Sequence, residues 1–442
     1  MRFAPHTEDE VREMLAACGL SSFDDLFAHL PGGVRLDRDL DIPEGVSEME
    51  LVGDLRRLAA RNRHADDFVC FAGGGAYDHY VPSVVWALAG RSELYTSYTP
   101  YQPELSQGVL QALFEYQSMI CELTGLDVSN ASLYDGPTAL VEAVHMATGA
   151  TRRQRVLVGA EIDPRYVETL RTYGAGEHFS IEMLDSDGGV SRAGATVEDD
   201  VAAVVLQSPN KWGNIEPVAG GLFEAARKAG ARAIHVFDPL SLGVLKSPAE
   251  LGADIAVAEG QVLGNHLNYG GPYLGIIAAH MQDVRRMPGR IAGETTDVDG
   301  QRGYVLTLQA REQHIRREKA TSNICTNQTL MAVAATVYLA WLGPDGLREL
   351  GEQCMAKAHY AAERLSDISA VELAWPGEEF FKEFVVHVGD DRSAEDVQRR
   401  LVERGFLAGP IVDGGLAISV TERRTREEID GFVKAFEEAV SS

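Results

Sequence analysis

Lysine is scarce in this sequence, and acidic side chains far outnumber basic ones. Only seven of the 40 basic residues are lysines, and 66 acidic residues leave a net charge of −26 over 442 residues. Binding to nucleic acids and to anionic membranes depends on basic patches, so the acidic excess argues against either partner. No long apolar run is present, and the opening residues lack the basic and apolar regions of a signal peptide. We therefore expect a cytoplasmic protein.

Cysteine and histidine do not form metal-binding patterns. The five cysteines are widely spaced without a CxxC pair, and the 12 histidines include no HxxxH or HExxH pair. Isolated histidines such as His145 and His235 are therefore expected to be structural, and no metal site is predicted. A GxSxG elbow, a Walker loop and a GxGxxG loop are also missing, so hydrolases, NTPases and Rossmann enzymes have little support.

The hydrophobic pattern predicts an α/β fold. Between about residues 150 and 280, short β-rich runs alternate with helical stretches, which is typical of βαβ units around a mainly parallel sheet. A helix is predicted over about 104–124, where apolar residues from Leu105 onward recur at steps of three and four, and another over about 326–362. The predicted divisions are an N-terminal helical arm over 1–65, a large domain over 66–325 and a smaller α/β domain over 326–442.

Asp238 follows a β-rich run, Ala233–Phe237. This context is typical of the aspartate that pairs with the pyridine nitrogen in a large class of pyridoxal-phosphate enzymes. Their cofactor lysine lies on a later strand, before a glycine-rich turn, and ungapped comparison places it near Val262. No lysine occurs between Lys246 and Lys319. The sequence thus predicts the scaffold of a cofactor site without its nucleophile, and a self-sufficient enzyme would have to use Lys246 or Lys319.

A loop rich in hydroxyl groups, Asn130–Ala139, runs directly into a predicted helix. A helix N-terminus of this kind can hold a phosphate through its free N–H groups. Pro137 removes one of those donors, however, and Asp135 would repel a phosphate. We therefore favour a capped helix start over a phosphate site in this loop.

Four longer segments resemble a known family. They are YTPYQPELSQG (Tyr98–Gly108), QSPN (Gln207–Asn210), NYGGPYLG (Asn268–Gly275) and REQHIRREKATSNICTN (Arg311–Asn327). Together they strongly resemble the glycine cleavage system P-protein family, glycine dehydrogenase (decarboxylating). The match is to its N-terminal-half type, which in many prokaryotes is a separate subunit 1, or α subunit, and it covers nearly the whole chain.

The resemblance implies a fold, a partner and a reaction. The fold is that of the aspartate-aminotransferase-like pyridoxal-phosphate transferases (fold type I). The Schiff-base lysine belongs to a second subunit, β, with which the chain forms an α2β2 tetramer. Such enzymes decarboxylate glycine on pyridoxal phosphate and pass the aminomethyl group to the lipoyl group of H-protein. On this interpretation the chain has no catalytic residue of its own, is inactive without subunit 2 and does not bind the cofactor covalently.

The resemblance also suggests which residues face the partner's active site. Tyr98, Thr99, Tyr101 and Gln102 offer hydroxyl and amide groups to a small polar substrate. The alternative is a proline-rich turn whose tyrosines pack on the body of the protein. If neither this loop nor any other segment contributes side chains, the chain is a non-catalytic scaffold that only stabilises the β subunit.

Two further groups of residues are candidates. Arg316 and Arg317, within a basic segment expected to be helical, would form ion pairs at a subunit boundary or attract an anionic group, unless they only solvate a helix face. Asn268, Gly270 and Gly271 form a tight turn after the position of the missing lysine. With Asp238, they are predicted to be remnants of a cofactor site.

Overall fold

A computed structural model describes residues 5–177, 179–192, 194–389 and 392–441. Its contacts divide the chain into two compact units, Met1–Arg63 and His64–Ser442. The second unit holds both of the larger sheets, so this division does not separate the large domain from the smaller one. The domain boundaries predicted at residues 65 and 325 therefore stay predictions.

The first unit contains two short α-helices, α1 (Glu8–Ala17) and α2 (Glu48–Ala59). Each begins at a capping box, which Thr7 and Glu10 form at α1. Between them the chain forms a short 3-10 helix, Asp24–Phe27.

The apolar side chains of this first unit are exposed. None of residues 5–63 is buried. The most exposed of these side chains include Phe23, Val34, Leu40, Ile42, Val46 and Met49.

The second unit is built on a seven-stranded sheet with the order β2-β10-β9-β8-β7-β3-β4. The strands from β9 to β4 are parallel, and β10 runs antiparallel to both of its neighbours. The predicted α/β fold with a mainly parallel sheet is therefore confirmed. The strands are β2 (Val128–Ser129), β3 (Arg155–Val158), β4 (Ser180–Met183), β7 (Val201–Ser208), β8 (Arg232–Phe237), β9 (Ile255–Glu259) and β10 (Gly275–Ala279).

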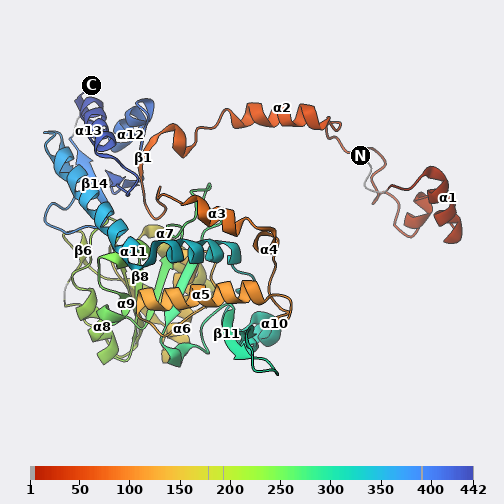
Figure 1. Cartoon of the computed structure of the whole chain (residues 1–442), viewed down its shortest axis with the longest axis horizontal. Coiled ribbons are helices and arrows are strands. Elements are labelled where there is room, and N and C mark those ends of the chain that lie inside the picture. The colour runs from red at the N-terminus through yellow and green to blue at the C-terminus, as the bar shows by residue number, and fades with distance from the viewer. Residues whose placement is uncertain (1–4, 178, 193, 390–391, 442) are drawn as a thin grey trace. The chain divides into compact units, whose positions relative to one another are not determined.

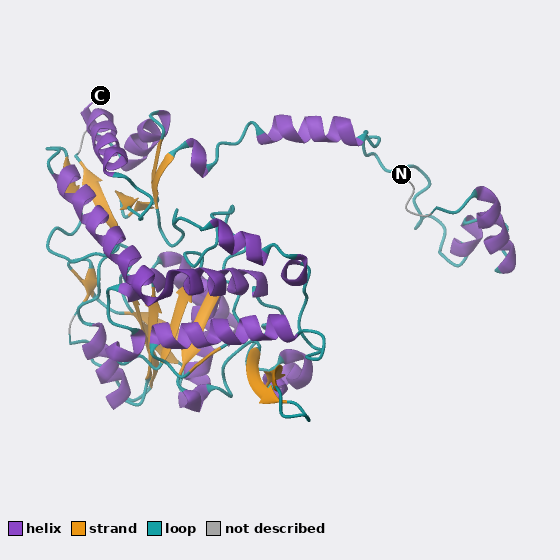
Figure 2. Cartoon of the chain, in the orientation of Figure 1, coloured by secondary structure: helices purple, strands orange, loops and turns teal. Residues whose placement is uncertain are grey.

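Helices cover both faces of this sheet (Figures 1 and 2). Alternate side chains of a strand point to opposite faces. On β9, Ala256 and Ala258 belong to the core that includes α5 and α11, whereas Ile255 and Val257 belong to the core that includes α6 and α7. These helices are α5 (Gln107–Thr124), α6 (Gly136–Thr151), α7 (Pro164–Glu177) and α11 (Thr329–Ser366). Two more helices, α8 (Ala219–Lys228) and α9 (Pro248–Leu251), contribute to a smaller core with residues of β7 and β8.

Helix α5 shows where the predicted pattern holds and where it fails. Val109, Leu113 and Ile120 are buried, and Gly125 ends the helix in the left-handed conformation (φ +71°). Leu105 was expected on the same buried face, but it is 78% exposed. That expectation is wrong because the helix begins at Gln107, so Leu105 lies in the preceding turn.

Helix α11 is long and apolar enough to cross a membrane by length and composition alone. Its φ/ψ values are non-helical at Gly343, and Pro344 follows, so the helix is kinked there. Buried side chains such as Tyr338 pack with α5 in the core of the second unit. We therefore interpret α11 as a core helix.

A second, antiparallel sheet follows α11, with the order β13-β14-β17-β16. Its strands are β13 (Val371–Leu373), β14 (Glu383–Val388), β16 (Ile411–Val412) and β17 (Gly415–Ser419), and α12 (Ala394–Glu403) and α13 (Arg426–Ser441) pack in the same core. The shorter elements are β1 (Val69–Ala72), paired with β15 (Phe406–Gly409), the pair β5 (Ser186–Asp187) and β6 (Val190–Ser191), the hairpin β11 (Ile291–Thr296) and β12 (Arg302–Thr307), and helices α3 (Ser83–Ala89), α4 (Ser92–Tyr95) and α10 (Gln313–Arg316).

Candidate functional site

A cavity lies where parallel strands of the large sheet end. Gln207 at the end of β7, Asp238 after β8 and Glu259 at the end of β9 all line it. Carboxyl ends of parallel strands meet at one edge of a sheet, which is the usual place for a ligand in this class of fold. Residues from outside the sheet also line it, among them Gly74, Gly75 and Tyr77, the loop after β7, and Phe381–Glu383, which leads into β14. We call this space the Asp238 cavity.

Lys382 occupies the centre of the polar contacts in the Asp238 cavity. Its side chain is only 2% exposed, and its Nζ lies 2.6 Å from Asp238 Oδ2. The same Nζ lies 3.0 Å from His79 Nε2 and 3.8 Å from the centre of the Tyr77 ring. An ammonium group has three N–H donors, and these three neighbours account for all of them.

Lys211 is the other lysine that lines the cavity. Its Nζ lies 2.9 Å from Asp413 Oδ2 and 3.2 Å from Glu161 Oε2. Both cavity lysines are thus ion-paired within the chain. Sequence reasoning missed them because it searched for a lysine after β9, whereas these come from the loop after β7 and from the start of β14.

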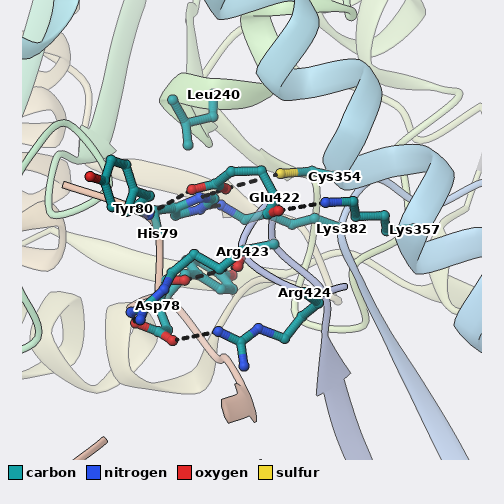
Figure 3. A network of polar contacts seen from close by, with 12 residues as sticks. Asp78, His79, Tyr80, Leu240, Cys354, Lys357, Lys382, Glu422, Arg423 and Arg424 are labelled. Carbon is teal, nitrogen blue, oxygen red and sulfur yellow. Dashed lines mark hydrogen bonds and ion pairs between the residues drawn. The ribbon is translucent and has the colours of Figure 1, made fainter. Parts of the chain in front are cut away.

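His79 connects Lys382 to a second acidic group, Glu422, which follows β17 (Figure 3). Because Lys382 donates to Nε2, the proton of the imidazole resides on Nδ1, which donates to Glu422 Oε2 at 2.6 Å. Burial and the neighbouring Lys382 lower the pKa of His79, so the ring is neutral. Burial alone would raise the pKa of Glu422, but the hydrogen bonds from His79 and from the N–H of Tyr80 act in the opposite direction and lower it.

His79, Glu422 and Cys354 are also a set of side chains of the kinds that bind metals. The 2.6 Å separation of His79 Nδ1 and Glu422 Oε2 is that of a hydrogen bond, and Cys354 Sγ lies 3.7 Å from the same oxygen. Burial raises the pKa of the Cys354 thiol, which keeps it protonated. The hydrogen bonds therefore explain this group without a metal ion.

Glu383, the residue after Lys382, is another buried acid of the Asp238 cavity. Its Oε1 accepts the N–H of Gly74 at 2.6 Å, and its Oε2 accepts the hydroxyl of Tyr77 at 2.8 Å. Burial raises the pKa of Glu383 to about 7 in spite of these hydrogen bonds. The backbone is tightly fitted here, because a Cβ on Gly73 would lie 2.2 Å from Glu383 Oε1.

The N-terminus of α6 contacts Glu259, which lines the cavity, and it is fully capped. Asp135 Oδ1 accepts the N–H of Thr138 at 2.8 Å, and Glu259 Oε2 accepts the N–H of Gly136 at 3.0 Å. Pro137 has no N–H to offer. The prediction of a capped helix start is confirmed, and the carboxyl groups take the place that a phosphate would need. Burial raises the pKa of Glu259 to about 7.

These residues do not fit a pyridoxal-phosphate cofactor in this chain's own cavity. Val262 is buried and lines the cavity with Asp238, where the missing lysine was predicted. Asp238 already holds an ammonium group, and the N–H groups of α6 already hold carboxyl groups. Lys246 and Lys319, the two lysines that a self-sufficient enzyme would have to use, are exposed and do not line the cavity.

The loop Tyr98–Gln102 lies on the surface, at the end of α5 where α10 is also found (Figure 1). Tyr98 is 77% exposed, and Thr99 is half-buried. Tyr101 is half-exposed, and its hydroxyl accepts a hydrogen bond from Arg290 Nη2 at 2.7 Å. The Tyr101 ring also lies 6.2 Å from the ring of His314.

The segments Tyr98–Gln102 and Arg311–Asn327 therefore meet, although the sequence separates them widely. The basic run Arg311–Lys319 is not the continuous helix that was expected. It forms a 3-10 turn, the single turn α10 and another 3-10 turn, because Leu308 and Arg317 have positive φ values of +53° and +55°.

The arginines of this segment divide into two kinds. Arg311 donates to the backbone carbonyls of Met287 and Gly289, so it holds the fold together. Arg316 and Arg317 are exposed. We refer to Tyr98, Thr99, Tyr101, Gln102, Arg316 and Arg317 together as the tyrosine–arginine surface.

The remaining candidates, Asn268, Gly270 and Gly271, form a surface turn. Asn268 Nδ2 donates to the carbonyl of Gly271 at 3.1 Å, and Gly270 has a φ of +95°. Tyr269 between them is 94% exposed. Of the residues that the structure describes, those that line the Asp238 cavity do not include this turn. The turn and Asp238 therefore do not form one site.

Comparisons with known proteins agree on one family. The model of the glycine cleavage system P-protein matches residues 1–436. The probable glycine dehydrogenase (decarboxylating) subunit 1 of Moorella thermoacetica is 52% identical to this chain over 445 residues, which cover 98% of this chain and 99% of the relative. The corresponding protein of Carboxydothermus hydrogenoformans is also 52% identical over 98% of this chain and 99% of its own length.

The structure is similar to solved structures of the same fold class. A crystal structure of glycine decarboxylase (P-protein) of the glycine cleavage system, in inhibitor-bound form, is 46% identical and has a TM-score of 0.92. It covers 99% of this chain and 100% of that one. The solved structures that match this chain are enzymes of the pyridoxal-phosphate fold type I, so the predicted fold class is confirmed.

Proposed function

Because this chain belongs to the glycine cleavage system P-protein family, we propose that it is subunit 1 of a two-subunit glycine decarboxylase. It would act in the cytoplasm with a lysine-bearing subunit 2 in an α2β2 assembly. The proposed reaction releases CO2 from glycine and transfers the remaining aminomethyl group to the lipoyl group of H-protein. Pyridoxal phosphate, held covalently by subunit 2, supplies the electron sink for the decarboxylation.

The observation that carries this proposal is the combination of a near-complete match to proteins named subunit 1 with an unsuitable cavity. A self-sufficient enzyme would need a lysine free to bind the cofactor. Here Val262 stands at the predicted position, and the cavity lysines Lys211 and Lys382 are both ion-paired. Both observations support a cofactor lysine that is supplied by another chain.

Exposed side chains support a partner-facing role. The first unit does not bury the apolar residues of 5–63 in a core of its own, and their burial against subunit 2 would be favourable by about 25 cal/mol for each Å². Within the tyrosine–arginine surface, Tyr98, Arg316 and Arg317 have exposed side chains that could meet a partner or a substrate. In the assembled enzyme, Tyr98, Thr99, Tyr101 and Gln102 would orient glycine by hydrogen bonds, while Arg316 and Arg317 would attract its carboxylate.

The test is reconstitution. The full chain alone, given pyridoxal phosphate and labelled bicarbonate, should catalyse no glycine-dependent exchange of CO2. Exchange should appear when subunit 2 and lipoylated H-protein are added. Exchange by the isolated chain would contradict the proposal, and borohydride trapping with peptide mapping would then identify the lysine responsible.

A non-catalytic scaffold is the second candidate, since the apolar residues of 5–63, which the first unit does not bury itself, would serve it equally well. Tyr98→Phe in the assembled complex separates the two, because Tyr98 is 77% exposed and loses only its hydroxyl group. If Tyr98 touches the substrate, kcat/KM should fall by about tenfold, the value of one hydrogen bond. Tyr80→Phe, at another exposed tyrosine, is the matched control. Unchanged turnover of the Tyr98 variant in an intact complex would favour the scaffold.

A further inference from the structure

Two features of the Asp238 cavity would attract a charged ligand if they were free. One is the carboxylate of Asp238 at the end of β8, which would hold a cation. The other is the N-terminus of α6, whose N–H groups and helix dipole would hold an anion. In this chain, side chains from other segments already occupy both positions.

Lys382 completes the coordination of Asp238. Its three donors meet Asp238 at 2.6 Å, His79 at 3.0 Å and the face of Tyr77 at 3.8 Å. Asp238 Oδ1 also accepts the N–H of Leu240 at 2.9 Å, so both carboxylate oxygens are engaged. A second cation could bind Asp238 only by displacing an ammonium group that is 2% exposed.

Glu259 satisfies the helix end in a similar way. One carboxyl oxygen accepts Gly136 N–H at 3.0 Å, and the other accepts the N–H groups of Gln261 and Leu274 at 3.0 and 3.1 Å. Because Glu259 belongs to β9, these bonds tie the helix start to the sheet. An incoming phosphate would have to displace them and meet Asp135 as well.

We infer that the Asp238 cavity is a cofactor-type site filled by the chain itself, in which Lys382 replaces the cationic ring of a ligand and Glu259 replaces the oxygens of its phosphate. The filled site then holds the two sheets of the second unit together, because Lys382 and Glu383 lie at the start of β14 in the smaller sheet and Asp238 follows β8 of the large sheet. The inference does not depend on the reaction proposed above. It also predicts what an opened site would take: removal of the Lys382 side chain beyond Cβ leaves Asp238 ready for a small primary ammonium ion.

The first test is chemical rescue of Lys382→Ala in the full chain. The variant should unfold at a lower temperature than the wild type, because Asp238 is left without its counter-ion. Propylammonium, which matches the missing atoms, should raise the midpoint of the variant by about 1.5 °C at concentrations near ten times its Kd. Neutral propanol at equal concentration should not do so.

The matched control is the double variant Asp238→Asn with Lys382→Ala, which has the same space but no carboxylate. Its midpoint and that of the wild type should not respond to propylammonium. A response of equal size in the control, or none in a folded Lys382→Ala variant, would overturn the inference.

A second measurement uses the wild type and does not require any variant to fold. Pyridoxamine phosphate carries the ring and phosphate of the cofactor but no aldehyde that would react with surface lysines. Equilibrium dialysis of the full chain against this compound at about 1 mM, far above the Kd of an ordinary cofactor site, should show no stoichiometric binding. One equivalent retained by this chain would overturn the inference, whereas the proposed function would then be judged separately by CO2 exchange.

Discussion

The Asp238 cavity and the tyrosine–arginine surface treat their polar groups in opposite ways. In the cavity, Lys382, Asp238 and Glu383 are each engaged by partners from the same chain. On the surface, Tyr98 and Arg316 are exposed to solvent. A buried polar group without a partner is costly, so the cavity has to be satisfied internally, whereas an exposed group is free to serve a partner. The difference suggests that the cavity maintains the fold and the surface carries the function.

The largest effect on stability is expected from a substitution at Gly213, where the backbone at the cavity is packed most closely. Gly213 has a φ of +83°, and a Cβ there would lie 1.8 Å from the carbonyl oxygen of Glu383. Gly213→Ala should lower the free energy of unfolding by about 3 kcal/mol or more, because it adds both strain and a clash with β14. Urea unfolding of the full chain measures this loss.

Gly221→Ala is the matched control. Gly221 lies in α8 with no heavy atom within 4 Å of its Cβ position and no positive φ. This variant should be unchanged or more stable by up to about 1 kcal/mol, since alanine favours the helix. Equal midpoints for the two variants would contradict the tight approach of Gly213 to β14.

The buried acids of the cavity predict an unusual dependence of stability on pH. Burial raises the pKa of Glu383 from its ordinary value of 4.5 to about 7. Between these values the folded state keeps a proton that the unfolded state has lost, so stability should fall as the pH rises from 4.5 to 7 and then level off. The group contributes up to about 3 kcal/mol to this fall.

Glu383→Gln removes the titration but keeps the shape of the side chain. Its urea midpoint should change less between pH 5 and pH 8 than that of the wild type, and it should exceed the wild type at pH 8. Glu259 also has a pKa of about 7, so part of the slope should remain. Glu372→Gln, on the exposed side of β13, is the control and should follow the wild type. Parallel curves for the wild type and Glu383→Gln would contradict the assignment.

The smallest effect on the chain itself is expected at the tyrosine–arginine surface. Arg316→Ala and Arg317→Ala, alone or together, should change the free energy of unfolding by less than about 0.5 kcal/mol. If this surface faces a subunit or an anionic substrate, the same changes should weaken assembly or raise KM in the complex, and more so at low salt. Arg285→Ala, at another exposed arginine, is the control. A large loss of stability in the isolated chain would show that these arginines maintain the fold instead.

Local patterns predicted most of the elements because their causes lie within a few residues. The capping box at Thr7 and the C-terminal Gly125 of α5 both depend on neighbours within one turn. Ser47 and Glu50 form the same kind of box at α2, and this available signal was overlooked. The basic segment after Leu308 was mispredicted as a helix, since left-handed residues other than glycine leave no clear mark in a sequence.

The candidate site was less predictable. Asp238 and Val262 were placed near one cavity from a strand pattern, and both line it. Lys382 and Glu383 gave a weaker signal, two charges inside the apolar run from Phe380 to Val388, which often marks a buried ion pair. Nothing near either residue indicates what the charges meet.

The family, the mainly parallel α/β architecture and the lack of a lysine near Val262 can all be read from the sequence, because they depend on motifs, local periodicity and residue identity. That the site is filled becomes visible only in the folded chain. Lys382 meets His79 across 303 residues of sequence, and such a pair forms only when the sheets and the segment before α3 have been brought together. The scarcity of lysine is thus less important than the position of one lysine, whose burial requires the partners that the fold supplies.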